Sequence, residues 1–544
     1  MPSDPSPFTR HDDVKIPMRD GIRLSANIFI PREGSSFPVI LVRTPYNAGR
    51  IEEANQWVSR GYAAVYQDTR GRFRSEGEDI PWMGEKDDAQ DTLDWLVQQP
   101  WCNGKVGMYG GSYPGFTQVA AARTGHPALK AITPALIGAE RYAFNYRNGA
   151  LRFGSRTRWM MRVPPEFDIE RFENHLPLKT LDLLVHGRVN PLWREVLENP
   201  VYNEVWRHDS LSEDVERLKA PAFIRTGWFD LFICDTFNLF AQFHEHAPCD
   251  EVRKRTRIIV GPWPHEINNT KYDDVDFGKT GKIPDLFEQE LRYLDHHLKG
   301  TPDPVPAPIQ LFVMGANCWR HENEWPLART RWTRLYLAGG GRANTAGGDG
   351  LLAERPSGTP DHFTYDPLNP VPTHGGAWCF TNVGLKDQRE LEKRNDVLVY
   401  TSAPLPEPVE VTGPVSAELY VSSSAPDTDF TVKLVDVAPD GTALGITDGI
   451  ARVRYRNGIP EGELLKPGEV VRVTIECPPT SYLFKPGHRI RVDISSSNFP
   501  VFARNLNTGG PIAEECTPVV AHQTVYHSEE YPSHVVLPVI PNPV

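Results

Sequence analysis

The feature that most constrains the fold of this chain is a change in its hydrophobic pattern near residue 329. Before that point, short apolar runs suited to buried strands alternate with amphipathic stretches suited to helices. Residues 38–43 and 62–66 are such apolar runs. After them, and before the next apolar run at 105–109, Ala89, Leu93 and Leu96 share one helical face. Strand and helix alternating in this way predict a parallel sheet with helices packed on its faces.

The alternation is interrupted between residues 141 and 215, which are rich in aromatic residues and arginine and carry helical stretches at 166–173 and 178–184. It resumes at 221–226 and 257–261, continues through a helix whose apolar face includes Leu291 and Leu294, and ends in a last strand at 309–314. The interruption therefore predicts a helical cap inserted into an α/β domain.

After residue 329 the apolar runs alternate with polar residues, as at 415–421, so each strand should have one wet face. Turn pairs such as Asp440-Gly441 separate the runs, and no helical pattern follows, which is typical of a β-sandwich or jelly roll. The glycine-rich stretch 339–348 lacks the Gly-Lys-Ser/Thr ending of a phosphate loop and is interpreted as a hairpin loop. The expected domains are a first α/β part, the cap, a second α/β part and an all-β domain, at residues 1–140, 141–215, 216–328 and 329–544.

Charge and cysteine content exclude several classes of protein. The chain has 58 Lys and Arg against 70 Asp and Glu, a net charge of -12, which argues against a nucleic-acid partner or an anionic membrane surface. The opening residues lack the apolar core of a signal peptide, and no stretch approaches the roughly 18 apolar residues of a membrane span. Seven cysteines without a C-x-x-C pair fit reduced thiols, so a cytoplasmic protein is expected. The oligomeric state is left open, with a homodimer as one option.

The strongest local signal is the segment 106–116, VGMYGGSYPGF, in which a strand runs into Gly110-Gly111-Ser112 and a helix begins at once. Small residues at a sharp strand-to-helix turn are typical of a nucleophile elbow, which presents a serine hydroxyl at the helix N-terminus. The second glycine, Gly115, stands one residue later than in G-x-S-x-G. The alternative is a glycine-rich turn whose serine merely caps the helix.

A nucleophilic serine needs a base, and the base needs an acid to orient it. The strand at 222–226 is followed by Asp230 and the strand at 257–261 by His265, so both lie after the carboxyl ends of parallel strands, where α/β folds carry their sites. Ser112, His265 and Asp230 therefore form a candidate catalytic triad. Asp235 is a rival acid, and the alternative for His265 is a loop histidine beside prolines.

An acyl-transfer site also needs donors directed at the developing oxyanion. The backbone N–H of Tyr113, next after the nucleophile, is one donor by geometry. The second should come from the loop after the strand ending at Arg43, where the Tyr46 hydroxyl could serve. The alternative is a tyrosine packed on the rim with its hydroxyl in water.

The predicted cap is rich in arginine, with Arg141, Arg147, Arg152, Arg156, Arg158 and Arg162 inside 22 positions. One interpretation is a solvated helix face, and the other is a cationic patch that receives an anionic substrate group, since Arg binds carboxylates bidentately. Candidate substrate-binding residues are Arg152, Arg156 and Arg158, with Trp228 beside Asp230.

Metal chemistry is not expected. His244-Glu245-His246 and His296-His297 lack the H-E-x-x-H spacing of zinc proteases, and neighbouring histidines on a helix point in different directions. The His296-His297 pair is interpreted as lying on a helix surface. No metal and no cofactor are predicted.

Five ordered motifs and two stretches of the β-region resemble the CocE/NonD family of serine hydrolases, which is related to α-amino-acid ester hydrolases and X-Pro dipeptidyl-peptidases. The motifs are RTPYN (43–47), QDTRGRFRSEG (67–77), GGSYPG (110–115), GWFD (227–230) and GPWPH (261–265), and the stretches are 427–441 and 483–500. The resemblance implies that Ser112, Asp230 and His265 form the triad and that Tyr46 and the Tyr113 amide form the oxyanion hole. It also implies an α/β-hydrolase core, an inserted helical cap and a C-terminal jelly-roll (galactose-binding-like) domain.

The sequence thus predicts a metal-free serine hydrolase that cleaves an ester, or an amide, of a small molecule through an acyl-enzyme. One alternative is an amidase, acylase or X-Pro dipeptidyl-peptidase-like aminopeptidase of the same family, which for an amino-terminal substrate would need an acidic pocket. Another is a non-catalytic carbohydrate-binding protein built on the β-domain. The order Ser, Asp, His, each in its expected context, favours the hydrolase.

Overall fold

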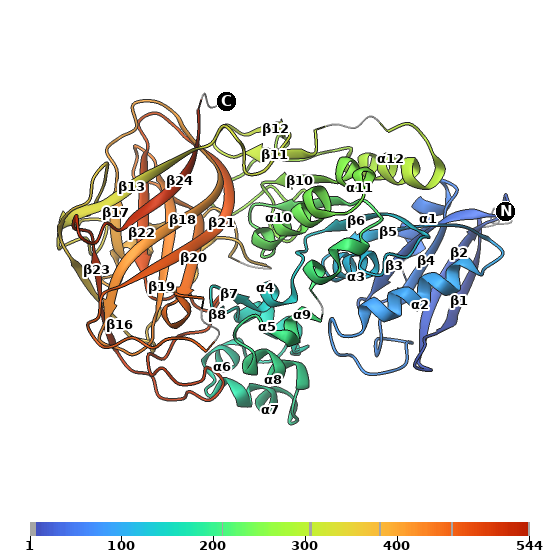
Figure 1. Cartoon of the computed structure of the whole chain (residues 1–544), viewed down its shortest axis with the longest axis horizontal. Coiled ribbons are helices and arrows are strands. Elements are labelled where there is room, and N and C mark those ends of the chain that lie inside the picture. Colours follow the sequence, from blue (N-terminus) through green and yellow to red (C-terminus); the bar gives the residue numbers. More distant parts are fainter. Residues whose placement is uncertain are drawn as a thin grey trace.

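The structure is a computed structural model that describes residues 7–49, 51–208, 210–303, 307–379, 382–458 and 461–541. In these ranges a mostly parallel sheet of ten strands forms the first half of the fold (Figure 1). Its strands in spatial order are β1 (Phe8–Pro17), β2 (Arg23–Pro31), β4 (Ala63–Asp68), β3 (Phe37–Thr44), β5 (Cys102–Gly111), β6 (Leu129–Ala135), β9 (Phe223–Gly227), β10 (Arg257–Gly261), β11 (Ile309–Val313) and β12 (Cys318–Glu322).

The central strands are parallel and buried on both faces, which explains why they are continuous apolar runs in the sequence. Alternate residues of β3 enter different clusters: Val39 and Leu41 belong to one, Ile40 and Val42 to the other. The first cluster includes residues of α2, α3 and α10, and the second includes residues of α1 and α12. These helices are α1 (Ile51–Val58), α2 (Glu85–Val97), α3 (Tyr113–Ala122), α10 (Ile233–Ala241) and α12 (Leu286–Lys299), and the π-helix η3 (Gln242–His246) and α11 (Asp250–Arg255) follow α10.

The sequence predicted that the sheet would end with the strand at 309–314, but the structure contains one further strand. Strand β12 follows and pairs antiparallel with β11, from Cys318 opposite Val313 to Glu322 opposite Ile309. Its sequence, CWRHE, has no regular apolar alternation, and it lies at the edge of the sheet, where charged residues are common. That composition explains why the pattern alone did not indicate a strand.

The segment between β6 and β9 is mainly helical and lies beneath the gap between the two halves of the molecule in Figure 1. It begins with α4 (Arg141–Asn145), a small antiparallel hairpin and α5 (Gly154–Met160). Its elements are α4, β7 (Tyr146–Arg147), β8 (Ala150–Leu151), α5, α6 (Ile169–Asn174), η1 (Leu178–Thr180), α7 (Leu181–His186), α8 (Pro191–Glu198), α9 (Glu204–Arg207) and η2 (Leu211–Arg217).

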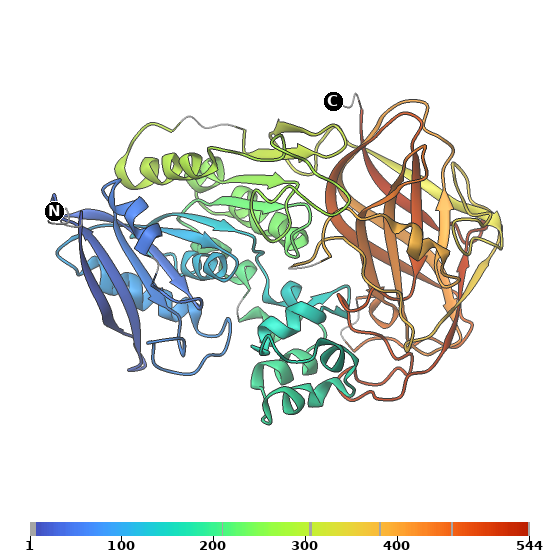
Figure 2. The same cartoon turned by 180° about the vertical axis from the view of Figure 1, so that it is seen from behind.

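The second half is all-β apart from two short 3-10 turns, η4 (Gln388–Lys393) and η5 (Val453–Tyr455), within the ranges described (Figure 2). Its main strand path is β16 (Asp361–Tyr365), β23 (Ala521–Tyr526), β18 (Val409–Ser423), β24 (His534–Ile540), β13 (Arg331–Gly340), β14 (Leu351–Ala353), β17 (Leu398–Thr401), β22 (Arg489–Ser495), β19 (Asp429–Val437) and β20 (Ala443–Arg452), with β15 (Ser357–Thr359) on β13 and β21 (Val471–Phe484) on β18. The glycine-rich stretch joins β13 to its antiparallel partner β14, which confirms the predicted hairpin loop.

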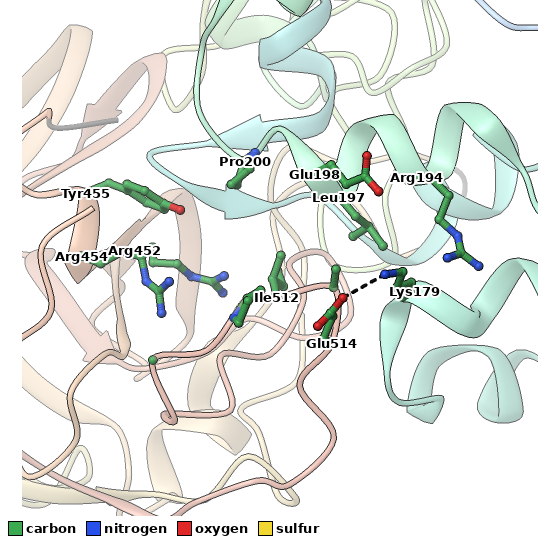
Figure 3. Close-up of a pocket in the computed structure, with 13 residues that line it drawn as sticks. Lys179, Arg194, Leu197, Glu198, Pro200, Arg452, Arg454, Tyr455, Ile512 and Glu514 are labelled. Atoms are coloured by element: carbon green, nitrogen blue, oxygen red, sulfur yellow. Dashed lines mark hydrogen bonds and ion pairs between the residues drawn. The ribbon is translucent and has the colours of Figure 1, made fainter. Parts of the chain in front are cut away.

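The helical segment and the all-β part are joined by backbone hydrogen bonds. The Phe153 N–H donates to the Val501 carbonyl, and the Ala503 N–H donates to the Leu151 carbonyl. A hollow of about 400 Å³ lies along the same seam, where the exposed ion pair of Lys179 and Glu514 spans the two parts (Figure 3). One apolar cluster runs continuously from the α/β part through the helical segment into the β-strands.

The expected fold class, an α/β-hydrolase core followed by an all-β domain, is confirmed. The exact domain limits at residues 140, 215 and 328 remain our proposal. Within the described ranges, no helix is long and apolar enough to cross a membrane.

Candidate active site

Ser112 stands in the sharp turn between β5 and α3. Its backbone has φ 60° and ψ -125°, a strained left-handed conformation for a residue with a side chain. Two glycines make the turn sterically feasible: a Cβ on Gly110 would lie 2.6 Å from Pro114, and one on Gly115 would lie 2.9 Å from the Ala135 carbonyl oxygen. The Ser112 N–H donates to that same carbonyl, which fixes the turn against β6. The geometry is that of a nucleophile elbow.

The structure brings Ser112, His265 and Asp230 together from three separate loops. Ser112 Oγ lies 2.9 Å from His265 Nε2, and His265 Nδ1 lies 2.6 Å from Asp230 Oδ2. Asp230 is fully buried, and its second oxygen accepts the Phe232 N–H at 2.7 Å. The buried carboxylate is thereby held on the ring nitrogen that faces away from the serine, which leaves Nε2 to accept the serine proton.

Asp235, the rival acid, points elsewhere. It lies in the first turn of α10, where it accepts the Glu140 N–H at 2.7 Å and a hydrogen bond from the Asn238 amide. Burial, with repulsion from Glu140, raises the pKa of Asp235 to about 7. Its role in the structure is to anchor the start of the helical segment to α10.

Tyr113 is held by its side chain as well as by the helix. Its hydroxyl donates to Glu85 at 2.7 Å and accepts the Trp82 N–H at 2.8 Å. Glu85 is in turn paired with the buried Arg43 at 2.8 Å. The Tyr113 N–H stands at the first position of α3, where helix geometry leaves it without an intrahelical partner. A rigid N–H beside the nucleophile is what an oxyanion hole requires.

Tyr46 lies in the loop after β3 and lines the same cavity as Ser112. The residue is 38% exposed, so part of its ring meets solvent. Burial raises the pKa of its phenol, while hydrogen bonding to Ser112 and Trp159 and the charges of Arg162 and Arg156 oppose that rise. The phenol therefore lies close enough to Ser112 and to these two guanidinium groups to feel their influence.

A cavity of about 370 Å³ opens beside Ser112 and His265. Its walls are mainly apolar, and they come from α/β loops, from α5 of the helical segment and from a loop of the all-β part. The apolar wall consists of Trp82, Ile137, Trp159, Leu231 and Phe232, and the remaining polar lining includes Ser155, Arg156 and Cys379. Burial raises the pKa of the Cys379 thiol to about 12, so this thiol is not a second nucleophile at neutral pH.

Of the three arginines expected to bind substrate, Arg156 lines this cavity. Arg152 is buried behind the wall, where one of its amino groups donates to the Leu231 carbonyl at 2.7 Å. Arg158 packs over the Phe172 ring, with amino groups 3.2 Å and 3.5 Å from the Pro164 and Phe167 carbonyls. The interpretation of all six arginines as one solvated face is wrong, because Arg141, Arg152 and Arg156 are buried.

Trp228 does not line the cavity either. Its indole N–H donates to the Phe312 carbonyl at 2.8 Å and its ring stacks on Phe237, which makes it part of the core beneath Asp230. His297 is half-buried with its ring edge-on to Tyr293, and burial lowers its pKa to about 3. The described residues contain no group of three or more His, Cys, Asp or Glu side chains that could hold a metal ion.

Sequence reasoning missed Trp82, Trp159, Ser155 and Cys379, which complete the cavity. Cys379 and Ser155 lie 224 positions apart and touch through their side chains at 3.5 Å. Neither stands in a motif, so no signal in the sequence alone could have indicated them. Trp159 directly follows Arg158 within the arginine cluster, which is the nearest hint that the sequence offers.

Comparisons with known proteins agree with this geometry. Residues 20–266 match the X-Pro dipeptidyl-peptidase (S15 family) model, and residues 304–536 match the X-Pro dipeptidyl-peptidase C-terminal non-catalytic domain. The chain is 41% identical to the cocaine esterase of Rhodococcus sp. (strain MB1 Bresler), across 97% of this chain and 98% of that protein. Among solved structures, it resembles an aminopeptidase from a marine sediment Thaumarchaeota archaeon (TM-score 0.85, 26% identity, 99% of both chains) and an α-amino acid ester hydrolase (TM-score 0.83, 27% identity, 98% and 97%).

Proposed function

The chain belongs to the CocE/NonD family of serine hydrolases and is a carboxylic ester hydrolase, and we propose that it cleaves small-molecule esters through an acyl-enzyme formed on Ser112. The observation that carries this proposal is the unbroken hydrogen-bonded chain from Ser112 Oγ through His265 to the buried Asp230. The cavity beside it has the size and apolar walls of a small-molecule site.

In the proposed mechanism His265 Nε2 takes the Ser112 proton as the oxygen attacks the ester carbonyl. Asp230 holds the proton on Nδ1 and stabilises the imidazolium that forms. His265 then gives its proton to the leaving alcohol, and the acyl-enzyme remains. In the second half His265 activates a water, which releases the acid and regenerates the serine.

We assign the oxyanion hole to the Tyr113 N–H and the Tyr46 hydroxyl. The first is supported by its place at the start of α3 and by the anchoring of its side chain on Glu85. The second is supported by the place of Tyr46 in the lining of the same cavity as Ser112. Two preorganised donors stabilise the charge that develops on the carbonyl oxygen, and this is commonly the largest contribution in acyl transfer.

The strongest alternative is an aminopeptidase, because one structural relative at 26% identity carries that name. An aminopeptidase needs a carboxylate in its pocket for the substrate ammonium. Among the described residues the cavity lining contains no Asp or Glu and does contain Arg156. We therefore favour an ester whose bound group is not cationic.

The proposal also covers the location of the protein and the roles of its other two parts. All seven cysteines are free, which fits a reducing compartment, and we propose a cytoplasmic location. We also propose that the all-β part is the jelly roll implied by the family and that the helical segment caps the active site. No nucleic acid, membrane or cofactor is part of the proposed function.

The decisive experiment is covalent labelling with a fluorophosphonate, followed by peptide mass mapping. The label should attach to Ser112 in the wild-type protein, and Ser112→Ala should lose both the label and ester turnover, with a reduction in turnover on the order of 10⁶. Circular dichroism provides the control for folding. A purified, folded Ser112→Ala protein that keeps a tenth of wild-type turnover would exclude Ser112 as the nucleophile.

A further inference from the structure

We propose that the substrate group filling the cavity beside Ser112 carries a carboxylate, and that Arg156 is the residue that binds it. The inference rests on the proposed ester hydrolysis and goes further by naming the substrate class: a half-ester of a dicarboxylic acid, or an ester of a carboxylate-bearing alcohol or phenol. Arg156 reaches the cavity from α5, on the same wall as Trp159 and Ser155.

Arg156 is 4% exposed and has incomplete hydrogen bonding. Its Nε donates to the Phe144 carbonyl at 3.0 Å, and its Nη2 donates to Asn145 Oδ1 at 3.2 Å. Among the described residues the structure gives Nη1 no hydrogen-bond acceptor and gives the guanidinium no carboxylate partner. A guanidinium has five N–H donors, so this one keeps unused donors at the surface of the cavity.

The charge of Arg156 persists at neutral pH. Burial lowers its pKa to about 9, which still leaves it protonated. The Trp82 ring lies under it at 4.4 Å and partly stabilises the cation. A buried guanidinium without a counter-ion is nevertheless costly to keep, and an incoming carboxylate would supply that counter-ion.

The surroundings of Arg156 add positive charge. Arg152 and Arg162 both disfavour its protonation by repulsion. Arg162 lies over the other aromatic wall residue, Trp159, at 4.4 Å and shares Asp79 with Arg72. Arg152, like Arg156, has no ion pair with a carboxylate in the described part of the chain. Of these three guanidinium groups, Arg156 alone lines the cavity, and it lacks a carboxylate counter-ion among the described residues, so an anion bound there gains most from Arg156.

The apolar walls define the rest of the ligand. Trp82, Trp159 and Phe232 suit a flat ring or a short aliphatic chain. A volume of about 370 Å³ accommodates such a body together with one carboxylate. A ligand of this kind has an ester carbonyl at Ser112, an apolar middle against the aromatic rings and a carboxylate at Arg156.

The test compares esters that differ only in this charge. One pair places the carboxylate on the acyl side: 4-nitrophenyl hydrogen adipate and its neutral isostere, 4-nitrophenyl adipamate. The other places it on the alcohol side: 4-carboxyphenyl butanoate and 4-carbamoylphenyl butanoate. Each ratio of kcat/KM is corrected for the spontaneous hydrolysis of the two esters. In the wild-type protein we expect the carboxylate to be preferred roughly tenfold to a hundredfold in at least one pair.

Variants assign the preference to one residue. Arg156→Met keeps most of the side-chain volume and should bring the ratio near one, whereas Arg156→Lys should retain part of the preference. Lys179→Met is the matched control, because it removes a positive charge from the same helical segment at the separate hollow of Figure 3. It should keep the wild-type ratio. Because both esters of a pair are measured on one preparation, a partly folded variant still gives a valid ratio.

The outcomes separate the two proposals. If the wild-type protein hydrolyses the neutral esters through Ser112 and prefers the carboxylate in neither pair, the carboxylate proposal is wrong and the esterase proposal stands; this result needs no Arg156 variant to fold. A preference that survives in Arg156→Met also overturns the assignment. If none of the four esters is hydrolysed in a Ser112-dependent way, the proposed function itself fails.

Discussion

At the scale of single residues, the role of a polar side chain in this site depends on which partner its polar atoms face. Asp230 and Asp235 are five positions apart and both buried, yet one contacts His265 and the other contacts the Glu140 backbone. The difference arises because Asp230 ends the turn after β9, whereas Asp235 already lies within α10. The same distinction separates Arg156, which lines the cavity, from Arg158 on the same helix, which turns toward backbone carbonyls of the loop that follows.

Replacing Tyr46 by Phe tests the second oxyanion donor at the residue scale. The change keeps the ring and removes the hydroxyl, so stability should barely change. Loss of one donor should lower kcat by ~10²–10³. Ground-state affinity should change little, because the oxyanion exists only at the transition state. Steady-state kinetics of the folded variant provide the measurement, and turnover within about threefold of wild type would place the second donor elsewhere.

At the scale of an element, the packing of α3 on β6 determines where Ser112, the proposed nucleophile, stands. Helix α3 is buried along its entire length, and its first turn approaches the end of β6 so closely that position 115 has no room for a side chain. The Ala135 carbonyl that crowds Gly115 also accepts the Ser112 N–H. The helix and the serine are therefore positioned by the same strand end.

Replacing Gly115 by Ala should push α3 away from β6. A Cβ there would lie 2.9 Å from the Ala135 oxygen and 3.0 Å from Ile137, which line the strand end and the cavity. Overpacking of this kind typically costs about 1–3 kcal/mol, more than the helix propensity of alanine returns. Both the thermal midpoint and kcat should fall.

Gly347→Ala is the control for the Gly115 substitution. Gly347 has no positive φ, and the nearest atom to its added Cβ is the Thr345 hydroxyl at 3.8 Å. This variant should unfold and react like wild type. If Gly115→Ala matched it in both thermal midpoint and kcat, close packing at the elbow would not be needed.

At the scale of the whole molecule, the α/β part, the helical segment and the all-β part all contribute residues to the lining of the candidate active site. Cys379, in a loop of the all-β part, lines the cavity, and the neighbouring Trp378 N–H donates to the Phe229 carbonyl at 3.2 Å. Phe229 directly precedes Asp230 in sequence. The loop that carries Asp230 is thus supported by a strand-rich region more than a hundred residues away.

A chain ending at Arg329 should therefore be neither stable nor active. Removing the all-β part would expose the apolar cluster that runs through Phe153 and Trp228 and would delete the support of Asp230. We expect aggregation, and turnover at least a hundredfold lower in any remaining soluble fraction. Size-exclusion chromatography and ester turnover provide the measurement. A monodisperse truncated protein with turnover within tenfold of the full chain would contradict a shared core.

The sequence by itself determined the parts of this protein that depend on neighbouring residues. The elbow at 110–115 could be identified because glycine spacing controls a local turn, and the alternation of apolar runs reflects strands and helices that each bury one continuous stretch. Asp230 and His265 could be placed because parallel strands deliver their carboxyl ends to one edge of the sheet. Strand β12 could not, since an edge strand requires no regular apolar pattern.

Only the tertiary structure decided which arginine faces the cavity and what completes its wall. Six cap arginines look alike in the sequence, because whether a side chain is buried, paired or open to a cavity depends on the segments that pack against it. Those segments are the ones that contain Trp82, Ser155 and Cys379, and they lie far apart along the chain. Local propensity carries no information about such contacts. The turn that presents Ser112 could therefore be predicted from the sequence, whereas the proposed choice of substrate depends on contacts that exist only in the fold.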